Sequence, residues 1–523
     1  MAEEHAQDRH PIGTPLTVAA GMALVCSLLF HGAELVNISI NADEENWMGR
    51  PDPTGFLLLG RWGLYLATRI LLPDSVFPIT SLAIFLIAYS ICFILLVKRL
   101  DIQSPISVVV ASPFFFGFPS LIYALVYSPL SFALGLGILA ATAVLYLSQR
   151  RTLTKLIFCS LLIAFGVSVY QSIIWYAIVV FVADVAACGM RVEQKNPAHC
   201  YQMALWYAAI TVLGLILYVL SSFLLLSWYG GHIQVLQGYV NFELLLKNPL
   251  KALELTLVEI LSIYGGWAPF FITQNLFYRL LTGCLGLILI LRIATAPISG
   301  ARRAGVLLLA IIIVLIPFLQ HPTAAGFLPY RSLVGVPAAL AILAFFATEG
   351  ATDRVRHWVL LPLSFLLIIE FSAISNRQYY AGILVNQRDR LMAWEMVSRI
   401  KQVVPQQPVY KIAIIGMGPL FDDFAVPVVP SSTLGTSLFQ INGGNSDRVA
   451  GLLILVSGTN FTAATAPEWE AAYDVALKMP PWPSAGSISQ LAGVTVIKLG
   501  EPTSEQIQLV CLGRQSEFCS RHR

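Results

Sequence analysis

Long apolar runs separated by short polar segments fill the chain up to about residue 371. A membrane-spanning helix needs about 20 predominantly apolar residues. The pattern predicts about eleven such helices, several of them short and therefore uncertain at their ends. The predicted spans are 16–35, 77–97, 106–126, 130–147, 156–169, 173–187, 204–226, 276–291, 306–318, 334–346 and 359–371.

The composition agrees with this pattern. Hydrophobic residues make up 57% of the chain and charged residues only 12%. A soluble domain carries about a quarter charged residues, so a soluble protein of this length is excluded. The chain is predicted to be an α-helical polytopic membrane protein.

The basic residues between the spans predict the orientation. They fall on alternate loops, which the positive-inside rule places in the cytoplasm together with the N-terminus. An odd number of spans then sends the tail outside. We expect no cleaved signal peptide, because the first apolar stretch is long and lacks a clear small-residue cleavage site. The basic loop residues are Lys98, Arg99, Arg150, Arg151, Lys155, Arg191, Lys195, Arg292, Arg302, Arg303, Arg354 and Arg356.

Three adjacent acids, Asp43, Glu44 and Glu45, follow the first span on the opposite side. Charge close to lipid is costly, so acids clustered at a membrane face suggest a functional site. The alternative is a solvated loop. Adjacent side chains cannot all point into one pocket, so at least one of the three is expected to be solvated or structural.

Two segments on the acidic side are unsuited to span. Residues 54–72 mix apolar side chains with Arg61 and Arg69, which suggests a helix lying in the membrane interface or, alternatively, an exposed connector. Residues 249–271 carry too many charges to cross and fit an interfacial or lumen-facing helix.

The sequence pattern of the C-terminal tail differs from that of the membrane part. Residues 376–523 predict a small α/β domain outside the membrane, and residues 1–375 a membrane domain with a first external loop at 36–76. Gly416-Met417-Gly418 lacks the rest of a phosphate-binding fingerprint and is interpreted as a turn after a strand. The tail predicts helices at 388–404 and 468–477 and strands at 409–415, 452–457, 493–499 and 508–512.

Eight cysteines are present, and only Cys511 and Cys519 fall in the external tail. An even pair in an oxidising compartment predicts a disulfide; two unpaired thiols near the terminus are the alternative. No Cys/His spacing suggests a zinc site, so no divalent metal or other cofactor is indicated. A nucleic-acid partner is not expected.

Short motifs follow one another in a fixed order along the chain. The membrane part has the acidic cluster, Gly60-Arg61-Trp62, Tyr170-Gln171 and Tyr330-Arg331. The tail has Ser437-Leu438-Phe439-Gln440, Gly444-Asn445-Ser446-Asp447-Arg448, Met479-Pro480-Pro481-Trp482-Pro483 and Gly486-Ser487-Ile488. This ordered set resembles the serotype-converting O-antigen glucosyltransferases, which are polytopic enzymes of the GT-C class. The chain departs from the family at one point: three acids run together where two are usual, and Arg50 lies further on.

The resemblance implies an enzyme of the bacterial inner membrane that moves glucose outside the cytoplasm. The donor would be a polyprenyl-phosphate-linked sugar within the lipid bilayer, and the acceptor the O-antigen repeat of lipopolysaccharide. Asp43 is the first candidate for the catalytic base, before Glu44 and Glu45. The candidates for binding the donor phosphate are Arg331, Arg61 and Arg50, and those for the substrate pocket are Tyr170, Gln171, Tyr330 and Trp62.

Three other functions remain open at the level of sequence. A carrier or flippase would place charges in mid-span and show inverted repeats, whereas we find no internal symmetry and the polar residues cluster at one face. A membrane scaffold would not need acids and arginines at one face. An O-antigen polymerase is a closer alternative, because it also acts on lipid-linked glycans from outside.

Overall fold

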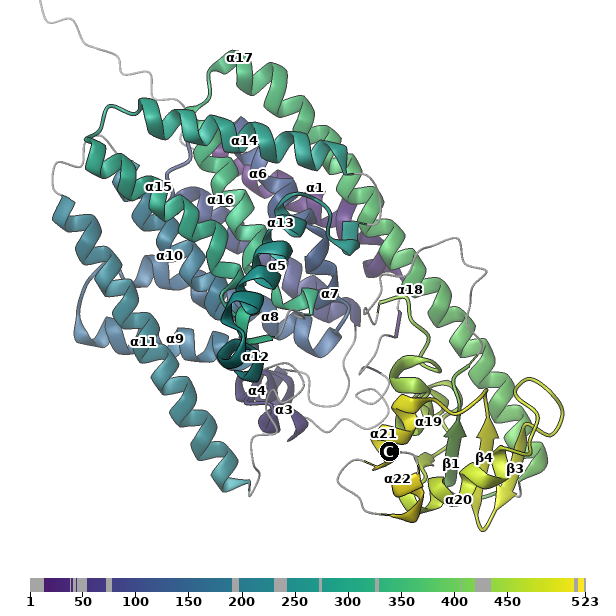
Figure 1. Cartoon of the computed structure of the whole chain (residues 1–523). Coiled ribbons are helices and arrows are strands. Elements are labelled where there is room, and N and C mark those ends of the chain that lie inside the picture. The colour runs from purple at the N-terminus through teal and green to yellow at the C-terminus, as the bar shows by residue number, and fades with distance from the viewer. Residues whose placement is uncertain are drawn as a thin grey trace, which may run out of the picture.

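The structure is a computed structural model of the whole chain (Figure 1). It describes residues 14–37, 39–40, 44, 54–71, 78–190, 197–229, 242–271, 275–324, 329–404, 406–418, 434–511 and 516–521.

The membrane part is a bundle of apolar helices (Figure 1). Within the described residues, nine helices are long and apolar enough to cross a membrane, and α9 and α16 are shorter apolar helices. The prediction of a polytopic helical membrane protein is confirmed. The bundle consists of α1 (Thr14–Val36), α5 (Pro78–Arg99), α6 (Pro105–Gly117), α8 (Ser128–Leu147), α9 (Leu153–Val169), α10 (Ile173–Met190), α11 (Pro197–Trp228), α14 (Leu276–Thr295), α15 (Gly300–Leu315), α16 (Gly335–Gly350) and α18 (Leu361–Val403).

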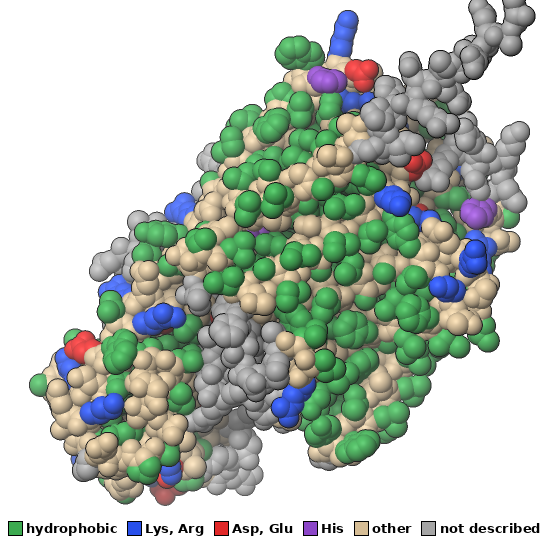
Figure 2. All heavy atoms as spheres, turned by 180° about the vertical axis from the view of Figure 1, so that it is seen from behind, with side chains coloured by type: hydrophobic (Ala, Val, Ile, Leu, Met, Phe, Trp, Pro, Cys, Tyr) green, Lys and Arg blue, Asp and Glu red, His purple; other side chains and the backbone are tan. Residues whose placement is uncertain are grey.

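Burial differs sharply among these helices. The span that contains α6 is 94% buried, whereas the span formed by α11 is only 22% buried. Phe115 of α6 stacks on Tyr89 and packs against Phe93, both from α5, in an aromatic core. Hydrophobic side chains cover the outer face of the bundle in Figure 2, as expected for a surface in contact with lipid.

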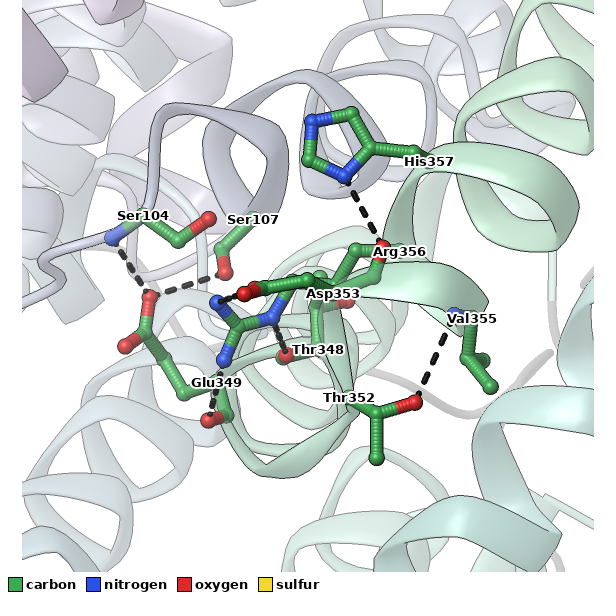
Figure 3. Close-up of polar contacts among 9 residues, drawn as sticks. All are labelled: Ser104, Ser107, Thr348, Glu349, Thr352, Asp353, Val355, Arg356 and His357. Atoms are coloured by element: carbon green, nitrogen blue, oxygen red, sulfur yellow. Dashed lines mark hydrogen bonds and ion pairs between the residues drawn. The ribbon is translucent and has the colours of Figure 1, made fainter.

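Polar contacts of Arg356 and Glu349 connect helix ends of the bundle (Figure 3). Arg356, after α17 (Asp353–Val355), donates from Nε to the Thr348 carbonyl at 2.9 Å and from Nη2 to the Glu349 carbonyl at 2.9 Å. Cations are favoured at helix C-termini, here that of α16. The Glu349 carboxylate accepts hydrogen bonds from the Ser104 amide at 2.9 Å and the Ser107 hydroxyl at 2.8 Å, which joins α16 to the start of α6.

Short helices gather at the opposite end of the bundle. The predicted helix at 54–72 is two helices divided at Gly60, whose φ of 68° breaks the helical path. The second packs tightly on α9, because a Cβ on Gly63 would lie 2.1 Å from the Ser168 hydroxyl. These short elements are α3 (Thr54–Leu58), α4 (Trp62–Leu71), η1 (Pro119–Leu121), α7 (Ile122–Leu125), α12 (Phe242–Lys247), α13 (Pro249–Tyr264), η2 (Pro269–Phe271), η4 (His321–Ala324) and η5 (Tyr330–Ser332).

Helix α18 connects the bundle to the C-terminal domain (Figure 1). It is 43 residues long and combines the predicted last span with the predicted amphipathic helix at 388–404. The predicted boundary between residues 375 and 376 therefore lies inside one continuous helix. Asn386 of α18 donates to the Ile40 carbonyl at 3.2 Å, so the domain and the segment after α1 lie on the same side of the bundle.

The domain contains a four-stranded sheet in the order β2-β1-β4-β3. β1 pairs in parallel with β2 and β4, whereas β3 is antiparallel to β4. The strands are β1 (Tyr410–Ile415), β2 (Phe461–Ala463), β3 (Ile488–Leu491) and β4 (Val494–Lys498), and the helices are α19 (Ser446–Ser457), α20 (Ala466–Ala476), α21 (Ser504–Cys511) and α22 (Glu517–Arg521).

Two predicted strands are wrong. Residues 452–457 belong to α19, and residues 508–511 belong to α21. Helix α19 is defined by its ends: the Asn445 side chain caps its first amides, and Gly458 follows it in the left-handed conformation. A short apolar run does not distinguish a buried helix from a strand, and the capping residues decide between them.

Motifs of the tail fasten the domain to α18. The Asp389 carboxylate accepts hydrogen bonds from the Ser437 hydroxyl at 2.6 Å and from the Leu438 amide at 2.7 Å. The Arg399 guanidinium lies over the Trp482 ring at 4.5 Å from its centroid. Two of the quoted motifs therefore have structural partners on this helix.

Candidate functional site

The acidic segment after α1 is anchored through Glu44, which is only 2% exposed. Its Oε1 accepts a hydrogen bond from the Ser128 amide at 2.7 Å and another from the Ser128 hydroxyl. Ser128 is the first residue of α8, so the carboxylate interacts with the positive end of that helix. Asp43, Glu45 and Arg50 lie outside the described residues.

Arg331 lies beside the same point of the structure. It belongs to η5, and its guanidinium lies over the ring of Tyr127 at 4.8 Å from the centroid. Tyr127 directly precedes Ser128, the partner of Glu44. One acid and one arginine of the sequence prediction therefore meet at the start of α8.

Tyr170 and Gln171 extend this cluster to Arg61. The Tyr170 hydroxyl lies 3.2 Å from the hydroxyl of Ser332, the residue after Arg331. The Arg61 guanidinium lies over the Tyr170 ring at 5.0 Å, and its Nε donates to Gln171 Oε1 at 3.3 Å. Contacts thus run without interruption from Glu44 to Arg61, across segments that are far apart in the sequence.

Aromatic residues form one side of the cluster. The Tyr330 ring packs edge-on against Phe270 at 4.9 Å and against Tyr123 at 5.3 Å. Burial, together with the charge of Glu259, raises the pKa of Tyr330 to about 12, so its hydroxyl is protonated at neutral pH. Tyr330 is therefore a neutral hydrogen-bonding group rather than a charge.

Trp62 adds an unused donor. Its indole N–H is buried and has no hydrogen-bond partner among the described residues. A buried donor without a partner reduces stability by roughly 1–3 kcal/mol, and a bound ligand that accepts its hydrogen bond would recover this free energy. Trp62 starts α4 directly after Arg61, and a substrate at the cluster could accept this hydrogen bond.

Glu34 is a polar residue of this region that the sequence analysis did not select. It lies in the last turn of α1 and is 7% exposed. Its Oε1 accepts a hydrogen bond from the Ser39 hydroxyl at 2.6 Å, while the buried Oε2 has no partner among the described residues. His31, one turn earlier on the same face, bonds to the Tyr379 hydroxyl at 2.9 Å. This pairing of polar residues three apart in an apolar span was the available signal.

The chemical capacity of the cluster follows from its charges. Carboxylates can accept a proton, and two guanidiniums at one membrane face can hold an anion such as a phosphate. The described residues hold no group of three or more His, Cys, Asp or Glu side chains that could bind a metal ion.

Two disulfides are present in the described part of the chain. Cys511 and Cys519 lie on α21 and α22, with their Cα atoms 5.4 Å apart. The second pair, Cys188 with Cys200, joins the end of α10 to the start of α11 and was not expected. It lies at the face with the basic loops, which the loop charges predict to be cytoplasmic and where free thiols would be expected.

The Cys511–Cys519 bond leads to a chemical prediction. In intact cells, neither cysteine should react with a membrane-impermeant maleimide until a reductant is added. Labelling of Cys511→Ser and Cys519→Ser variants, each with one remaining thiol, provides the positive control. Labelling of the unreduced wild-type tail at both positions would contradict the bond.

Comparisons with known proteins identify the family. The family model described as glucosyl transferase GtrII matches residues 32–348, and no curated protein matches the chain. A cryo-EM structure of the arabinofuranosyltransferase AftD from Mycobacteria is similar, with a TM-score of 0.41 and 14% sequence identity. That match covers 89% of this chain and 33% of the longer AftD chain. The family match includes Glu44, Arg61, Tyr170 and Arg331, and the chain therefore belongs to the glucosyl transferase GtrII family of membrane glycosyltransferases.

Proposed function

We propose that this enzyme transfers glucose from a polyprenyl-phosphate-linked donor to the O-antigen repeat of lipopolysaccharide, on the periplasmic face of the inner membrane. The observation that carries the proposal is the continuous cluster from Glu44 to Arg61. In this cluster Glu44 bonds to the start of α8, Arg331 lies over the neighbouring Tyr127, and Arg61 lies over Tyr170, which supports an acid–arginine site at one face of the membrane bundle. Acceptor activation and phosphate binding both need groups of this kind.

In the proposed reaction, a carboxylate and the arginines have different roles. A hydroxyl oxygen of the acceptor sugar bonds to the anomeric carbon of glucose while the bond from that carbon to the phosphate oxygen breaks. The hydroxyl proton passes to a carboxylate, because a sugar hydroxyl is a poor nucleophile while it keeps its proton. The leaving group is polyprenyl phosphate, a good leaving group that needs no acid. Its negative charge calls for the forked donors of Arg331, Arg61 and Arg50.

Asp43 is our candidate for the base. Glu44 Oε1 is already engaged by two donors of Ser128, which suits an anchor more than a proton acceptor. Asp43 directly precedes Glu44 in the sequence and matches the first acid of the family pattern. Glu45 remains a third candidate, and the Glu34 Oε2, which has no partner among the described residues, could accept a hydrogen bond from a second sugar hydroxyl.

Mass spectrometry of lipopolysaccharide from cells with and without the gene tests the function. We expect one added hexose on each modified O-antigen repeat. A change in chain length without added hexose would instead indicate a polymerase. Transport of the lipid-linked sugar without any transfer would indicate a flippase. Either result would overturn the proposal.

The periplasmic location is a separate prediction. The basic loops and the C-terminal domain lie at opposite ends of the bundle, as the loop charges require. A phosphatase reporter should therefore be active when fused after Arg523 and inactive when fused after Arg150. Activity at both positions, or at neither in folded fusions, would contradict this topology.

A further inference from the structure

An apolar groove of about 640 Å³ opens between α13, α14 and α16. One face of α14 forms its wall, from Arg279 through Gly283 and Gly286 to Leu289. Ten helical residues rise about 15 Å, which is half of a hydrocarbon core of about 30 Å. The groove therefore has the depth of one membrane leaflet.

The polar end of the groove carries a cation. The guanidinium of Arg279 lies over the Trp267 ring at 5.4 Å, and its Nη2 donates to the Gly266 carbonyl at 2.9 Å. This bond uses one of the five N–H groups of an arginine. Tryptophan is enriched at the membrane–water interface, so this end of the groove is suited to an anionic lipid headgroup.

The mouth of the groove faces the candidate site. Arg292, near the end of α14, bonds to the Phe346 carbonyl near the end of α16, so the two helices run in the same direction. Arg279 therefore lies at the end where α16 begins, close after η5. Phe270, three residues after Trp267, contacts the ring of Tyr330 beside Arg331. One short segment thus connects the mouth of the groove to the proposed phosphate-binding arginine.

Two glycines keep the wall of the groove open. A Cβ built on Gly283 or on Gly286 meets no atom of the described residues within 4 Å. Tight helix packing therefore does not explain these glycines. Each of them nevertheless costs the helix roughly 0.8–1 kcal/mol relative to alanine. Open space on a helix wall suits a methyl-branched chain, which is wider than a straight acyl chain.

We propose that this groove binds the polyprenyl chain of the lipid-linked sugar donor, with Arg279 at its mouth and Gly283 and Gly286 along its wall. The assignment rests on the proposed function. To that function the groove assignment adds the position of the lipid chain and a basis for distinguishing the donor from ordinary phospholipids. The apolar chain occupies one leaflet depth, and its phosphate end emerges on the side of Arg331.

The test fills the groove without disturbing the fold. Gly286→Leu places a side chain in space that none of the described residues occupies. Gly21→Leu on α1 is the matched control, because a Cβ on Gly21 likewise has no atom of the described part of the chain within 4 Å. The purified full-length protein is assayed with two glucose donors that share the phosphate but differ in their lipid, a long polyprenyl chain and a geranyl chain. We expect Gly286→Leu to lower kcat/KM for the long-chain donor by about tenfold or more, as a changed apolar contact does. Activity with the geranyl donor should stay unchanged, and Gly21→Leu should match the wild type with both donors.

Each other outcome has one meaning. An equal loss with both donors would show that the substitution damages the site and would overturn the groove assignment. An undiminished preference for the long-chain donor would overturn it as well. Loss of a co-purified phospholipid in native mass spectra, with that preference intact, would show that the groove holds an ordinary membrane lipid. A wild-type protein that transfers glucose from neither donor would refute the proposed function itself.

Discussion

Replacing Asp43 by asparagine should lower glucose transfer by about 10²–10⁴-fold, the usual effect of losing a positioned base. The substitution preserves the shape of the side chain but removes its ability to accept a proton at neutral pH. The protein should still insert and fold. Transfer is measured as added hexose in lipopolysaccharide, at matched amounts of membrane-inserted protein.

Glu44→Gln is the matched control for this prediction. Its amide oxygen can still accept the hydrogen bonds that Ser128 donates to Glu44 Oε1, so activity should fall far less than in Asp43→Asn. Glu44→Ala removes these bonds and should reduce stability by about 1 kcal/mol, the usual loss for a helix cap. If Glu44→Gln is inactive while Asp43→Asn remains active, the base is Glu44. If neither variant loses activity, the carboxylate mechanism assigned to this segment is wrong.

Arg331→Lys should reduce kcat/KM by about 10–100-fold, which corresponds to losing one or two charge-assisted hydrogen bonds. Lysine keeps the positive charge and can still lie over the Tyr127 ring, but it lacks the planar fork that binds two phosphate oxygens together. Initial rates over a range of donor concentrations measure this loss. Raising the donor concentration should restore part of the transfer rate, because weaker binding of the phosphate raises KM.

Arg69→Lys supplies the control for a nonspecific effect of exchanging arginine for lysine. Arg69 lies in the last turn of α4, eight residues after Arg61, and it is exposed, so the exchange should leave the kinetics unchanged. A fully active Arg331→Lys enzyme would indicate that Arg331 only anchors the end of a helix at the membrane interface.

Features of the candidate site differed in how far the sequence revealed them. Tyr170-Gln171 and Tyr330-Arg331 were selected because they belong to the ordered motifs that carry the family resemblance. Their mutual contacts could not be predicted, because Arg61, Tyr170 and Ser332 come from three separate parts of the chain. Glu34 was overlooked because hydropathy averages a single acid into its span, and only packing shows that its Oε2 is buried without a partner among the described residues.

The sequence by itself determined the membrane character, the order of the spans and the side on which the acids and arginines gather. These properties follow from local hydropathy and loop charge, which act on each segment separately. Only the tertiary structure decided that Glu44 binds the start of α8 and that residues 452–457 are helical. It also decided that α13 and α14 border an apolar groove. Such features depend on the partner that each side chain meets, and those partners are brought together by packing between segments that are distant in the chain.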